Sequence, residues 1–377
     1  MTKLNELIQE LCPNGVEYKP LGDIATISRG GSFQKKDYTE NGVPCIRYGQ
    51  IYMHYGLFAE KTLTYISEEV AQKQKFAEPG DIIMAVTSEN MDDVCKCMAW
   101  LGSKKIAVSG HTAIIHHSIN PKYLVYWLSS TMFYQQKVKI AHGTKVIEVA
   151  PARLADIILP VPPLPVQREI VRILDNFTEL TAELTAELTA RKQQYAYYRD
   201  KLLAFGDDVP KDTLENLCDF QYGKGNSIPT APGEYPVYGC NGVVGTTNAF
   251  NSIDAPVIGH IGSAGIVNWG KGKHFVTYNG TICKVRPEKM ISRYAYHLLC
   301  SLHLERFVKG SQPFLSYSDF AKETVAVPPL NIQQRVVSIL DRFDTLCTDL
   351  SSGLPAEIEA RQKQYEYYRD KLLEFEK

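Results

Sequence analysis

Two stretches of the chain carry apolar or aromatic residues at steps of three and four positions, a spacing typical of long helices with one buried stripe. The first follows Val161-Pro162-Pro163, and the second follows Val327-Pro328-Pro329. At 1.5 Å per residue, about 40 helical residues make a rod of roughly 60 Å. We expect the two rods to pack through a coiled-coil seam. The seam residues predicted for it are Phe177, Leu184, Leu188, Tyr195, Tyr198, Leu202, Phe343, Leu350, Ile358, Tyr365, Tyr368 and Leu372.

Local signals indicate where the two rods begin and where one of them breaks. Pro165 suits the first turn of the first helix, and Asn331 with Gln334 resembles a capping box for the second. Ser351-Ser352-Gly353-Leu354-Pro355 should kink or interrupt the second rod.

Two regions outside the rods, 16–160 and 211–326, lack this periodicity and contain short β-type runs such as 81–86 and 256–261. Turns rich in Gly, Asn, Ser and Tyr separate these runs. Each region closes with a predicted helix and then a strand that returns to the Val-Pro-Pro entry. The predicted helices are 123–130 and 294–302, and the return strands are 157–161 and 324–327.

The strongest signal is an internal repeat. Tyr-Tyr-Arg-Asp-Lys-Leu-Leu occurs at 197–203 and again at 367–373, and the segment 161–177 matches 327–343. A period of nearly half the chain indicates two structural units and not a solenoid. We therefore expect an α+β chain in which two related α/β domains are separated by two long coiled-coil helices.

The expected boundaries follow from this repeat. They are 1–160 for the first domain with an N-terminal helix, 161–210 for the central helix, 211–326 for the second domain and 327–377 for the C-terminal helix. Within the central helix, Thr-Ala-Glu-Leu at 181–184 is repeated at 185–188. Each copy adds about one helical turn, or roughly 6 Å.

Two diverged globular regions, each followed by a matching long helix, resemble the specificity subunit of a type I restriction–modification enzyme. The Val-Pro-Pro-Leu entries, the two Tyr-Tyr-Arg-Asp-Lys-Leu-Leu blocks and the Thr-Ala-Glu-Leu repeat are similar to its IC group. The resemblance implies two target recognition domains, each of which reads half of a split DNA site through the major groove. The helices would pack antiparallel, which makes the architecture pseudo-two-fold. They would set the spacer between the half-sites and dock two modification (methyltransferase) subunits.

The resemblance also implies which cofactors and partners belong to the complex. Restriction (translocase–nuclease) subunits can join it. S-adenosylmethionine would be bound by the modification subunits, and ATP and Mg by the restriction subunits, so that this non-catalytic chain would hold no cofactor of its own.

Whole-chain charge argues against a simple basic DNA binder, because 41 Lys+Arg oppose 42 Asp+Glu in 377 residues. Counted by region, however, 16–160 and 211–326 each carry +2, whereas 161–210 and 327–377 each carry −2. This is the sign expected if the globular regions face DNA and the rods face protein.

Base edges in the major groove are matched by Arg, Lys, Asn, Gln, Ser and Thr side chains at loop tips, and aromatic residues can accompany them. For any single residue, contact with a phosphate is as compatible with the sequence as contact with a base. The DNA-binding candidates in the first region are Arg29, Ser32, Lys35, Lys36, Arg47, Tyr48, Gln50, Ser88, Asn90, His111 and Lys145. Those in the second are Tyr222, Lys224, Asn226, Asn241, Ser263, Asn268, Lys271, Tyr278, Asn279 and Gln312.

We identify no catalytic or metal site in the sequence. Val-Pro-Pro-Leu lacks the polar residue that begins the motif of amino-methyltransferases, and Cys95-Lys96-Cys97 has no second pair at zinc spacing, which favours two thiols on a strand. The N-terminus has no apolar signal-peptide run and no stretch approaches a membrane span of about 18 residues, so we expect a cytoplasmic protein. Two alternatives remain: a stand-alone nuclease or hydrolase with a coiled-coil dimeriser, and a helical scaffold without a DNA role.

Overall fold

The computed structural model describes residues 2–225, 232–349 and 352–375. The chain forms two compact units. One comprises Met1–Glu183 with Glu359–Lys377, and the other comprises Leu184–Ile358. Each unit therefore combines one globular region with segments of the long helices.

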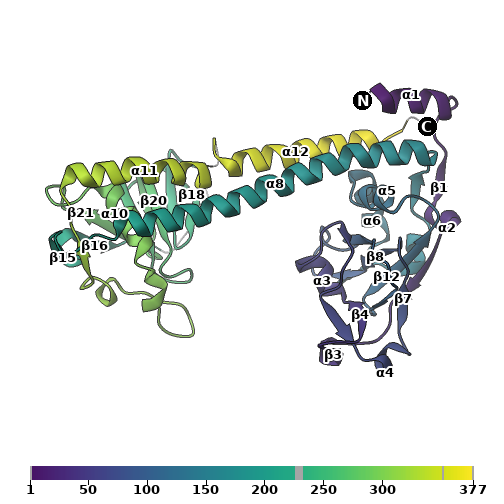
Figure 1. The fold of residues 1–377 in the computed structure, drawn as a ribbon, viewed down its shortest axis with the longest axis horizontal. Coiled ribbons are helices and arrows are strands. Elements are labelled where there is room, and N and C mark those ends of the chain that lie inside the picture. Colours follow the sequence, from purple (N-terminus) through teal and green to yellow (C-terminus); the bar gives the residue numbers. More distant parts are fainter. Residues whose placement is uncertain (1, 226–231, 350–351, 376–377) are drawn as a thin grey trace. The chain divides into compact units, whose positions relative to one another are not determined.

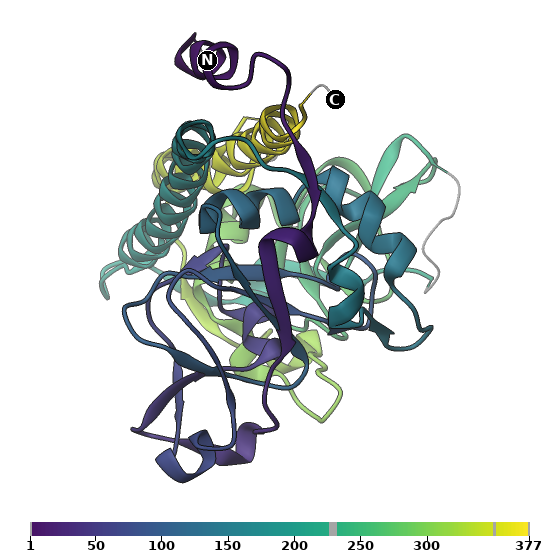
Figure 2. The ribbon, with the colours of Figure 1, turned by 90° about the vertical axis from the view of Figure 1, so that its right-hand side faces the viewer.

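The globular part of the first unit is built on two five-stranded sheets, in the orders β2-β12-β8-β10-β5 and β3-β6-β4-β11-β7. Figure 2 shows its N-terminal segment in purple, running from α1 at the N-terminus through β1 to α2. The elements are α1 (Thr2–Leu11), β1 (Tyr18–Pro20), α2 (Leu21–Ile24), β2 (Ala25–Arg29), η1 (Lys35–Asp37), β3 (Tyr38–Thr39), β4 (Val43–Ile46), α3 (Tyr48–Met53), β5 (Phe58–Ala59), β6 (Thr64–Ile66), α4 (Glu68–Ala71), β7 (Lys75–Ala77), β8 (Ile82–Ala85), β9 (Thr87–Ser88), β10 (Cys97–Trp100), β11 (Ile106–Val108), β12 (Thr112–His117), α5 (Pro121–Leu128), α6 (Thr131–Ile140), β13 (Ile147–Glu148), α7 (Pro151–Leu154) and β14 (Ile158–Pro160).

The globular part of the second unit has one six-stranded sheet in the order β16-β21-β19-β20-β17-β18. Its elements are β15 (Lys211–Thr213), α9 (Leu214–Leu217), β16 (Cys218–Tyr222), β17 (Tyr235–Gly239), β18 (Gly242–Thr247), β19 (Ser252–Gly259), β20 (Val267–Val276), β21 (Gly280–Val285), α10 (Ser292–Ser301), η2 (Leu304–Phe307), η3 (Tyr317–Asp319) and β22 (Thr324–Ala326). The predicted closing helices and return strands of both regions are confirmed, as α5 with β14 and α10 with β22.

The two sheets share a plan. In the first unit β12 pairs antiparallel with β2 and β8, and β8 pairs antiparallel with β10. In the second unit β21 pairs in the same way with β16 and β19, and β19 with β20. A parallel pair adjoins each set, β11 with β4 and β20 with β17. Strands can therefore be matched between the units, with the long strand β20 taking the pairings of both β10 and β11.

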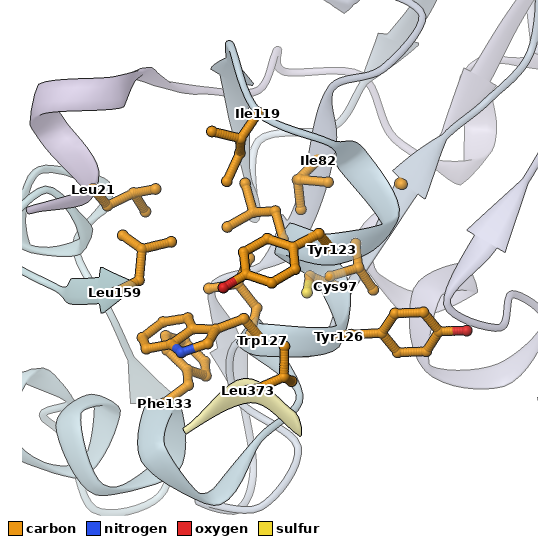
Figure 3. Packing of buried hydrophobic residues seen from close by; sticks show 14 of the residues in the cluster. Leu21, Ile82, Cys97, Ile119, Tyr123, Tyr126, Trp127, Phe133, Leu159 and Leu373 are labelled. Atoms are coloured by element: carbon orange, nitrogen blue, oxygen red, sulfur yellow. The ribbon is translucent and has the colours of Figure 1, made fainter. Parts of the chain in front are cut away.

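The central core of the first unit lies around α5, which places Tyr123, Tyr126 and Trp127 against buried residues of β8 and β10 (Figure 3). Asn120 caps α5, because its side-chain oxygen accepts hydrogen bonds from the backbone N–H groups of Lys122 and Tyr123, and Pro121 fills the first helical position.

Three long helices accompany the globular parts: α8 (Leu164–Leu203), α11 (Leu330–Thr348) and α12 (Leu354–Leu373). Figure 1 shows α12 beside the first half of α8 and α11 beside the second half. The predicted interruption is confirmed, since α11 ends before and α12 begins after a segment whose residues 350–351, with the seam candidate Leu350, lie outside the described residues. Among the helices that the structure describes, none has the length and apolar character needed to cross a membrane.

The predicted capping box of the second rod is wrong. Pro329 is the N-cap residue of α11, and no side chain caps this end. The helix begins at Leu330, two residues before the start that an Asn331 cap would give, so Asn331 and Gln334 lie inside the helix.

Aromatic stacking holds the helices together within each unit. In the first unit the ring of Phe177 on α8 stacks on Tyr368 of α12, with centroids 5.5 Å apart and planes 21° apart. In the second unit Tyr198 on α8 stacks on Phe343 of α11 at 5.6 Å and 23°. Phe177 and Phe343 occupy equivalent repeat positions, as do Tyr198 and Tyr368. These four residues thus form two copies of one contact.

The buried stripe of α11 differs from the apolar series in its sequence. Ile339 and Leu346 have helical spacing with Phe343, yet both are exposed. The buried positions are Gln333, Val336, Val337, Leu340, Asp344 and Cys347. The globular region, and not only the neighbouring helix, determines which face is covered, because Val336, Val337 and Leu340 belong to the core of the second unit.

A buried glutamine joins the start of each long helix to its globular region. The Gln167 side chain accepts a hydrogen bond from the Asn120 N–H at 2.9 Å and donates one to the Pro162 carbonyl at 2.7 Å. Gln333 repeats both contacts, accepting from the Ile291 N–H and donating to the Pro328 carbonyl, each at 2.9 Å. Each glutamine therefore fixes the Val-Pro-Pro entry to the segment that precedes α5 or α10.

About two turns further along each helix, equivalent aspartates form a second junction. Asp175 on α8 accepts hydrogen bonds from Lys122 and Tyr126 of α5, both at 2.7 Å. Asp341 on α11 accepts from Arg293 at 2.7 Å and contacts Nε2 of His297 on α10 at 2.8 Å. Burial lowers the pKa of His297, which favours the neutral ring that accepts from the Tyr195 hydroxyl and donates to Asp341.

We expect replacement of Gln333 by Leu to destabilise the second unit by about 3 kcal/mol. The substitution leaves the Ile291 N–H and the Pro328 and Lys289 carbonyls without their partner, and unpaired buried polar groups cost about 1–3 kcal/mol each. Urea unfolding followed by circular dichroism measures this as a lower midpoint. The matched control is Gln193→Leu at an exposed position of α8, and equal midpoints for the two variants would show that the buried glutamine has no such role.

Candidate nucleic-acid interface

The loops of the first unit that carry most of the DNA-binding candidates meet at one end of its sheets. The Gly30 N–H donates to the Thr112 carbonyl, which joins the end of β2 to the start of β12. The Ser109 N–H donates to the Ile46 carbonyl at the end of β4, and the Val86 N–H after β8 donates to the His111 carbonyl. The ends of five strands, β2, β4, β8, β11 and β12, are therefore linked by backbone hydrogen bonds, and the residues beyond them share one surface, which we call the first face.

A cavity of 440 Å³ opens in the first face. Its lining contains seven of the sequence candidates and no Asp or Glu side chain. The lining residues are Arg29, Gly31, Ser32, Phe33, Gln34, Lys35, Lys36, Arg47, Tyr48, Ser109, Gly110 and His111. Four permanent cations around a cavity without a carboxylate in its wall favour an anionic ligand or one rich in hydrogen-bond acceptors.

Side-chain contacts fix the backbone that presents these cations. The Gln74 side chain accepts from the Ser32 N–H at 2.7 Å, and Asp37 accepts from the Gln34 N–H at 2.7 Å. Lys35 and Lys36 then extend from η1 into solvent. Arg29 is more restrained, because Nε donates to the Gly110 carbonyl at 2.8 Å and its terminal nitrogen pairs with Glu148 at 3.1 Å.

Arg47 and Tyr48 form the wall between η1 and the His111 turn. The Tyr48 ring lies 5.0 Å from the His111 ring and 5.7 Å from the Arg47 guanidinium carbon. Arg47 Nε is buried and has no hydrogen-bond partner among the described residues. Gln50, by contrast, points inward: it is 8% exposed, and its side chain accepts from the Arg47 N–H at 2.9 Å. Gln50 supports the loop and is not on the surface.

A second cavity, of 500 Å³, lies on the other side of Tyr48 and includes Ser88, Asn90 and Val146 in its lining. Asn90 uses its side chain locally, donating to Asp93 and accepting from the Asp93 N–H, both at 2.8 Å. Burial raises the pKa of Tyr52 in this wall to about 12, so its hydroxyl stays protonated and donates to the Thr87 carbonyl. Lys145 is exposed on the loop beside Val146.

Equivalent strand ends in the second unit form a second face. The Gly223 N–H donates to the Gly280 carbonyl, the Thr277 N–H to the Tyr238 carbonyl, and the His260 N–H to the Asn279 carbonyl. These bonds correspond one by one to those at Gly30, Ser109 and Val86. Tyr222 therefore occupies the position of Arg29 at the end of the edge strand.

The second face is aromatic where the first is cationic. The Tyr222 ring contacts His260 at 4.3 Å and Tyr317 at 5.0 Å, and its hydroxyl lies 2.9 Å from the Ser316 hydroxyl. His260 also contacts Phe314 at 4.7 Å and Tyr278 at 5.5 Å. Tyr278 is 41% exposed and Phe314 is 39% exposed, so the cluster presents apolar surface to solvent.

The remaining candidates of the second unit are not all in one place. Lys224, Asn241, Ser263, Asn279 and Gln312 lie on the loops beyond the strand ends. Asn226 lies outside the described residues.

Two further candidates sit within β20. Asn268 pairs with Val257 near the second face, and its side-chain nitrogen is buried without a hydrogen-bond partner among the described residues. Gly270, the residue before Lys271, pairs with Ala255 of β19. Ala255 lies four residues before Gly259, where β19 ends. At about 3.3 Å per residue this places Lys271 roughly 13 Å along the strand, away from the other candidates.

Sequence reasoning missed Glu148, His260, Phe314 and Tyr317. The internal repeat contains a signal for these residues. In the structure, the Val149 N–H donates to the Val86 carbonyl, and the Leu315 N–H donates to the His260 carbonyl in the same way. Val149 and Leu315 are 166 residues apart, the separation of the two Val-Pro-Pro blocks. Extending that repeat upstream aligns the loop at 142–148 with the loop at 309–314 and places Glu148 opposite Phe314.

Neither face contains an arrangement typical of a catalytic metal centre. Within residues 2–225, 232–349 and 352–375, no three His, Cys, Asp or Glu side chains are grouped so that they could hold a metal ion. The expectation that Cys95 and Cys97 share a strand is wrong for Cys95, which precedes β10 and has a φ of 67°. Both thiols are buried, and burial raises the pKa of Cys95 to about 12.

Comparison with known proteins agrees with this architecture. The family model "Type I restriction modification DNA specificity domain" matches residues 13–191 and 208–360, and the chain belongs to this family. The EcoR124I/EcoR124II specificity subunit of Escherichia coli is 31% identical, and the match covers 100% of this chain and 98% of that protein. A putative type I specificity subunit of Mycoplasma pneumoniae, S.MpnORF201P, is 34% identical over 58% of this chain and 96% of its own length.

Two solved structures share the fold. The S subunit of a type I restriction–modification system from M. genitalium has a TM-score of 0.58 at 16% identity, covering 96% of this chain and 97% of its own. A chain from a study of complex assembly and conformational transition of the type I R-M system has a TM-score of 0.60 at 16% identity, covering 96% and 98%. The two family matches fall on the two units, each with its globular region and adjoining helix.

Proposed function

We propose that this chain is the DNA sequence-specificity subunit of a type I restriction–modification complex, in which the first and second faces each read one half of a bipartite DNA site. The observation that carries the proposal is that polar and aromatic side chains named as DNA-binding candidates lie at equivalent strand ends in both units. In the first unit, this convergence produces a cavity with four cations and no carboxylate in its wall. Such a surface suits the phosphates and base-edge acceptors of duplex DNA.

The long helices provide the second part of the proposal, a connection whose length is fixed. The Thr-Ala-Glu-Leu repeat at 181–188 spans the boundary between the units, which falls between Glu183 and Leu184, and α8 continues through it without a break. A helix has a defined rise per residue, so the number of repeats would set the spacer between half-sites. The same repeat supports assignment to the IC group.

The outer surfaces of the helices supply equivalent positions at which two modification subunits would dock. Tyr197 on α8 and Tyr367 on α12 are each 60% exposed, although both are large aromatic residues. Lys201 and Lys371 lie over these rings at the same distance, 5.8 Å. One exposed Tyr–Lys pair in each unit suits two copies of one partner, because aromatic residues are enriched at protein interfaces.

Assignment to such a complex brings further expectations. S-adenosylmethionine would be bound by the modification subunits, and ATP and Mg by restriction subunits that join them. We expect the complex in the cytoplasm of a bacterial or archaeal cell, because the host DNA on which it would act lies there.

Deletion of residues 185–188 tests the spacer role of α8. Removing one Thr-Ala-Glu-Leu copy shortens the helix by about 6 Å, which corresponds to between one and two base pairs of duplex DNA. We expect single-molecule sequencing of methylated host DNA to show a shorter spacer between two unchanged half-sites. Altered half-sites, or an unchanged spacer, would contradict this role.

Replacement of both Lys35 and Lys36 by Ala tests the charge of the first face. If each lysine neutralises one phosphate, the slope of log K against log salt concentration for the assembled complex becomes shallower by about 1.8. The methylated sequence should stay unchanged, because phosphate contacts position the protein and carry no sequence information. The control is Lys104→Ala with Lys105→Ala, an exposed pair at the other end of β11. Identical slopes for the two variants would remove the cavity lysines from the interface.

Replacement of Tyr197 or Tyr367 by Ala tests the docking surfaces. Each single variant should bind one modification subunit at normal affinity and the other at least about tenfold more weakly, since a buried interface aromatic contributes about 1–2 kcal/mol or more. Native mass spectrometry of the mixed subunits reports the stoichiometry. Lys192→Ala is the control, because Lys192 is exposed but lies about 140° around α8 from Tyr197. Full assembly of both tyrosine variants would place the docking surface elsewhere.

A further inference from the structure

Arg47 occupies a position that distinguishes the two faces. It follows Ile46, whose carbonyl accepts from the Ser109 N–H at 3.1 Å at the end of the parallel β4–β11 pair. In the second unit the equivalent residue is Gly239, which follows Tyr238, the acceptor for the Thr277 N–H at 3.0 Å. The same backbone thus carries a guanidinium in the first face and no side chain in the second.

The four cations of the first cavity differ in how many of their donors are available. Arg29 has committed donors to the Gly110 carbonyl and to Glu148. Lys35 and Lys36 are exposed on η1 and flexible, as single point charges. The Nε of Arg47, by contrast, is removed from water and has no hydrogen-bond partner among the described residues. Arg47 is therefore the planar group of this cavity whose donors are available to the acceptors of a ligand.

The surroundings of Arg47 fix its orientation before any ligand arrives. Its backbone N–H is bound by the buried Gln50 side chain, and the next N–H, of Tyr48, donates to the Ser109 hydroxyl at 3.1 Å. The Tyr48 ring, braced by His111, lies beside the guanidinium. A preorganised fork loses less entropy on binding than a free side chain, and it matches a pair of acceptors in one plane.

We propose that Arg47 reads a guanine in the half-site bound by the first unit. In the major groove, guanine presents N7 and O6 as two coplanar acceptors, the pattern that a guanidinium fork fits, whereas lysines suit phosphates. Because the second unit has Gly239 at this position, the guanine contact belongs to one half-site alone. This inference rests on the proposed function and adds the identity of one base.

The first experiment is the methylome of cells whose complex carries Arg47→Ala, compared with wild type and with Lys35→Ala. We expect Arg47→Ala to relax one guanine of one half-site to other bases and to leave the second half-site unchanged. Lys35→Ala should retain the wild-type motif. An unchanged motif for Arg47→Ala overturns the inference, as does a wild-type motif with no guanine in either half-site.

A binding measurement decides the case in which Arg47→Ala abolishes methylation altogether. The wild-type complex is titrated with duplexes in which 7-deazaguanine, which lacks the N7 acceptor, replaces each guanine in turn. We expect about tenfold weaker binding at one guanine of one half-site, and no further loss at that guanine for Arg47→Ala. Equal sensitivity of wild type and variant at every guanine overturns the inference. If the wild-type complex yields no bipartite motif, it is the proposed function itself that fails.

Discussion

The attachment of each globular region to the long helices is the constraint on which the rest of the molecule depends. In the first unit, Ile170 and Leu174 of α8 and Leu373 of α12 are fully buried members of the globular core. In the second unit, Leu340 of α11 and Leu203 of α8 have the same role. The buried glutamines and the partly exposed aspartates then fix rotation, because their hydrogen bonds reach the backbone just before α5 and α10 and side chains on these two helices. Each face is thereby held in a set orientation on its helix, as a spacer of defined length would require.

The two faces show how one backbone can serve two recognition chemistries. The hydrogen bonds that join the strand ends are the same in both units, whereas the side chains beyond them diverge: Arg29 with Glu148 in one, Tyr222 with Phe314 in the other. If both faces bind DNA as proposed, they would select different groups on it, since charge favours phosphates and guanine acceptors while apolar surface favours contact with a thymine methyl. The low net charge of the chain is compatible with this arrangement, because only one face depends on several cations and the helices are acidic.

Much of the architecture could be predicted from the sequence, because the sequence contains an internal repeat that marks both units. The repeat located both helix entries, and helical spacing found the stacked Phe177, Tyr198, Phe343 and Tyr368. Failures arose where tertiary contacts decide the outcome. Ile339 keeps the helical spacing but is exposed, because the globular core covers another side of α11. Gln50 is polar but buried, because its side chain binds the Arg47 N–H and fixes a loop. The site was partly visible from residue type, but its completion by Glu148, His260 and Phe314 depended on strand pairing between segments distant in sequence.

The account makes one central claim: two equivalent faces, held on helices of fixed length, read the two halves of a split DNA site. The most direct measurement is single-molecule sequencing of host DNA with this gene present and with it deleted. The account predicts a methylated motif of two short defined sequences separated by a non-specific spacer of constant length, which disappears in the deletion strain. A continuous motif that depends on this gene, or a methylation pattern that the deletion leaves unchanged, would contradict it.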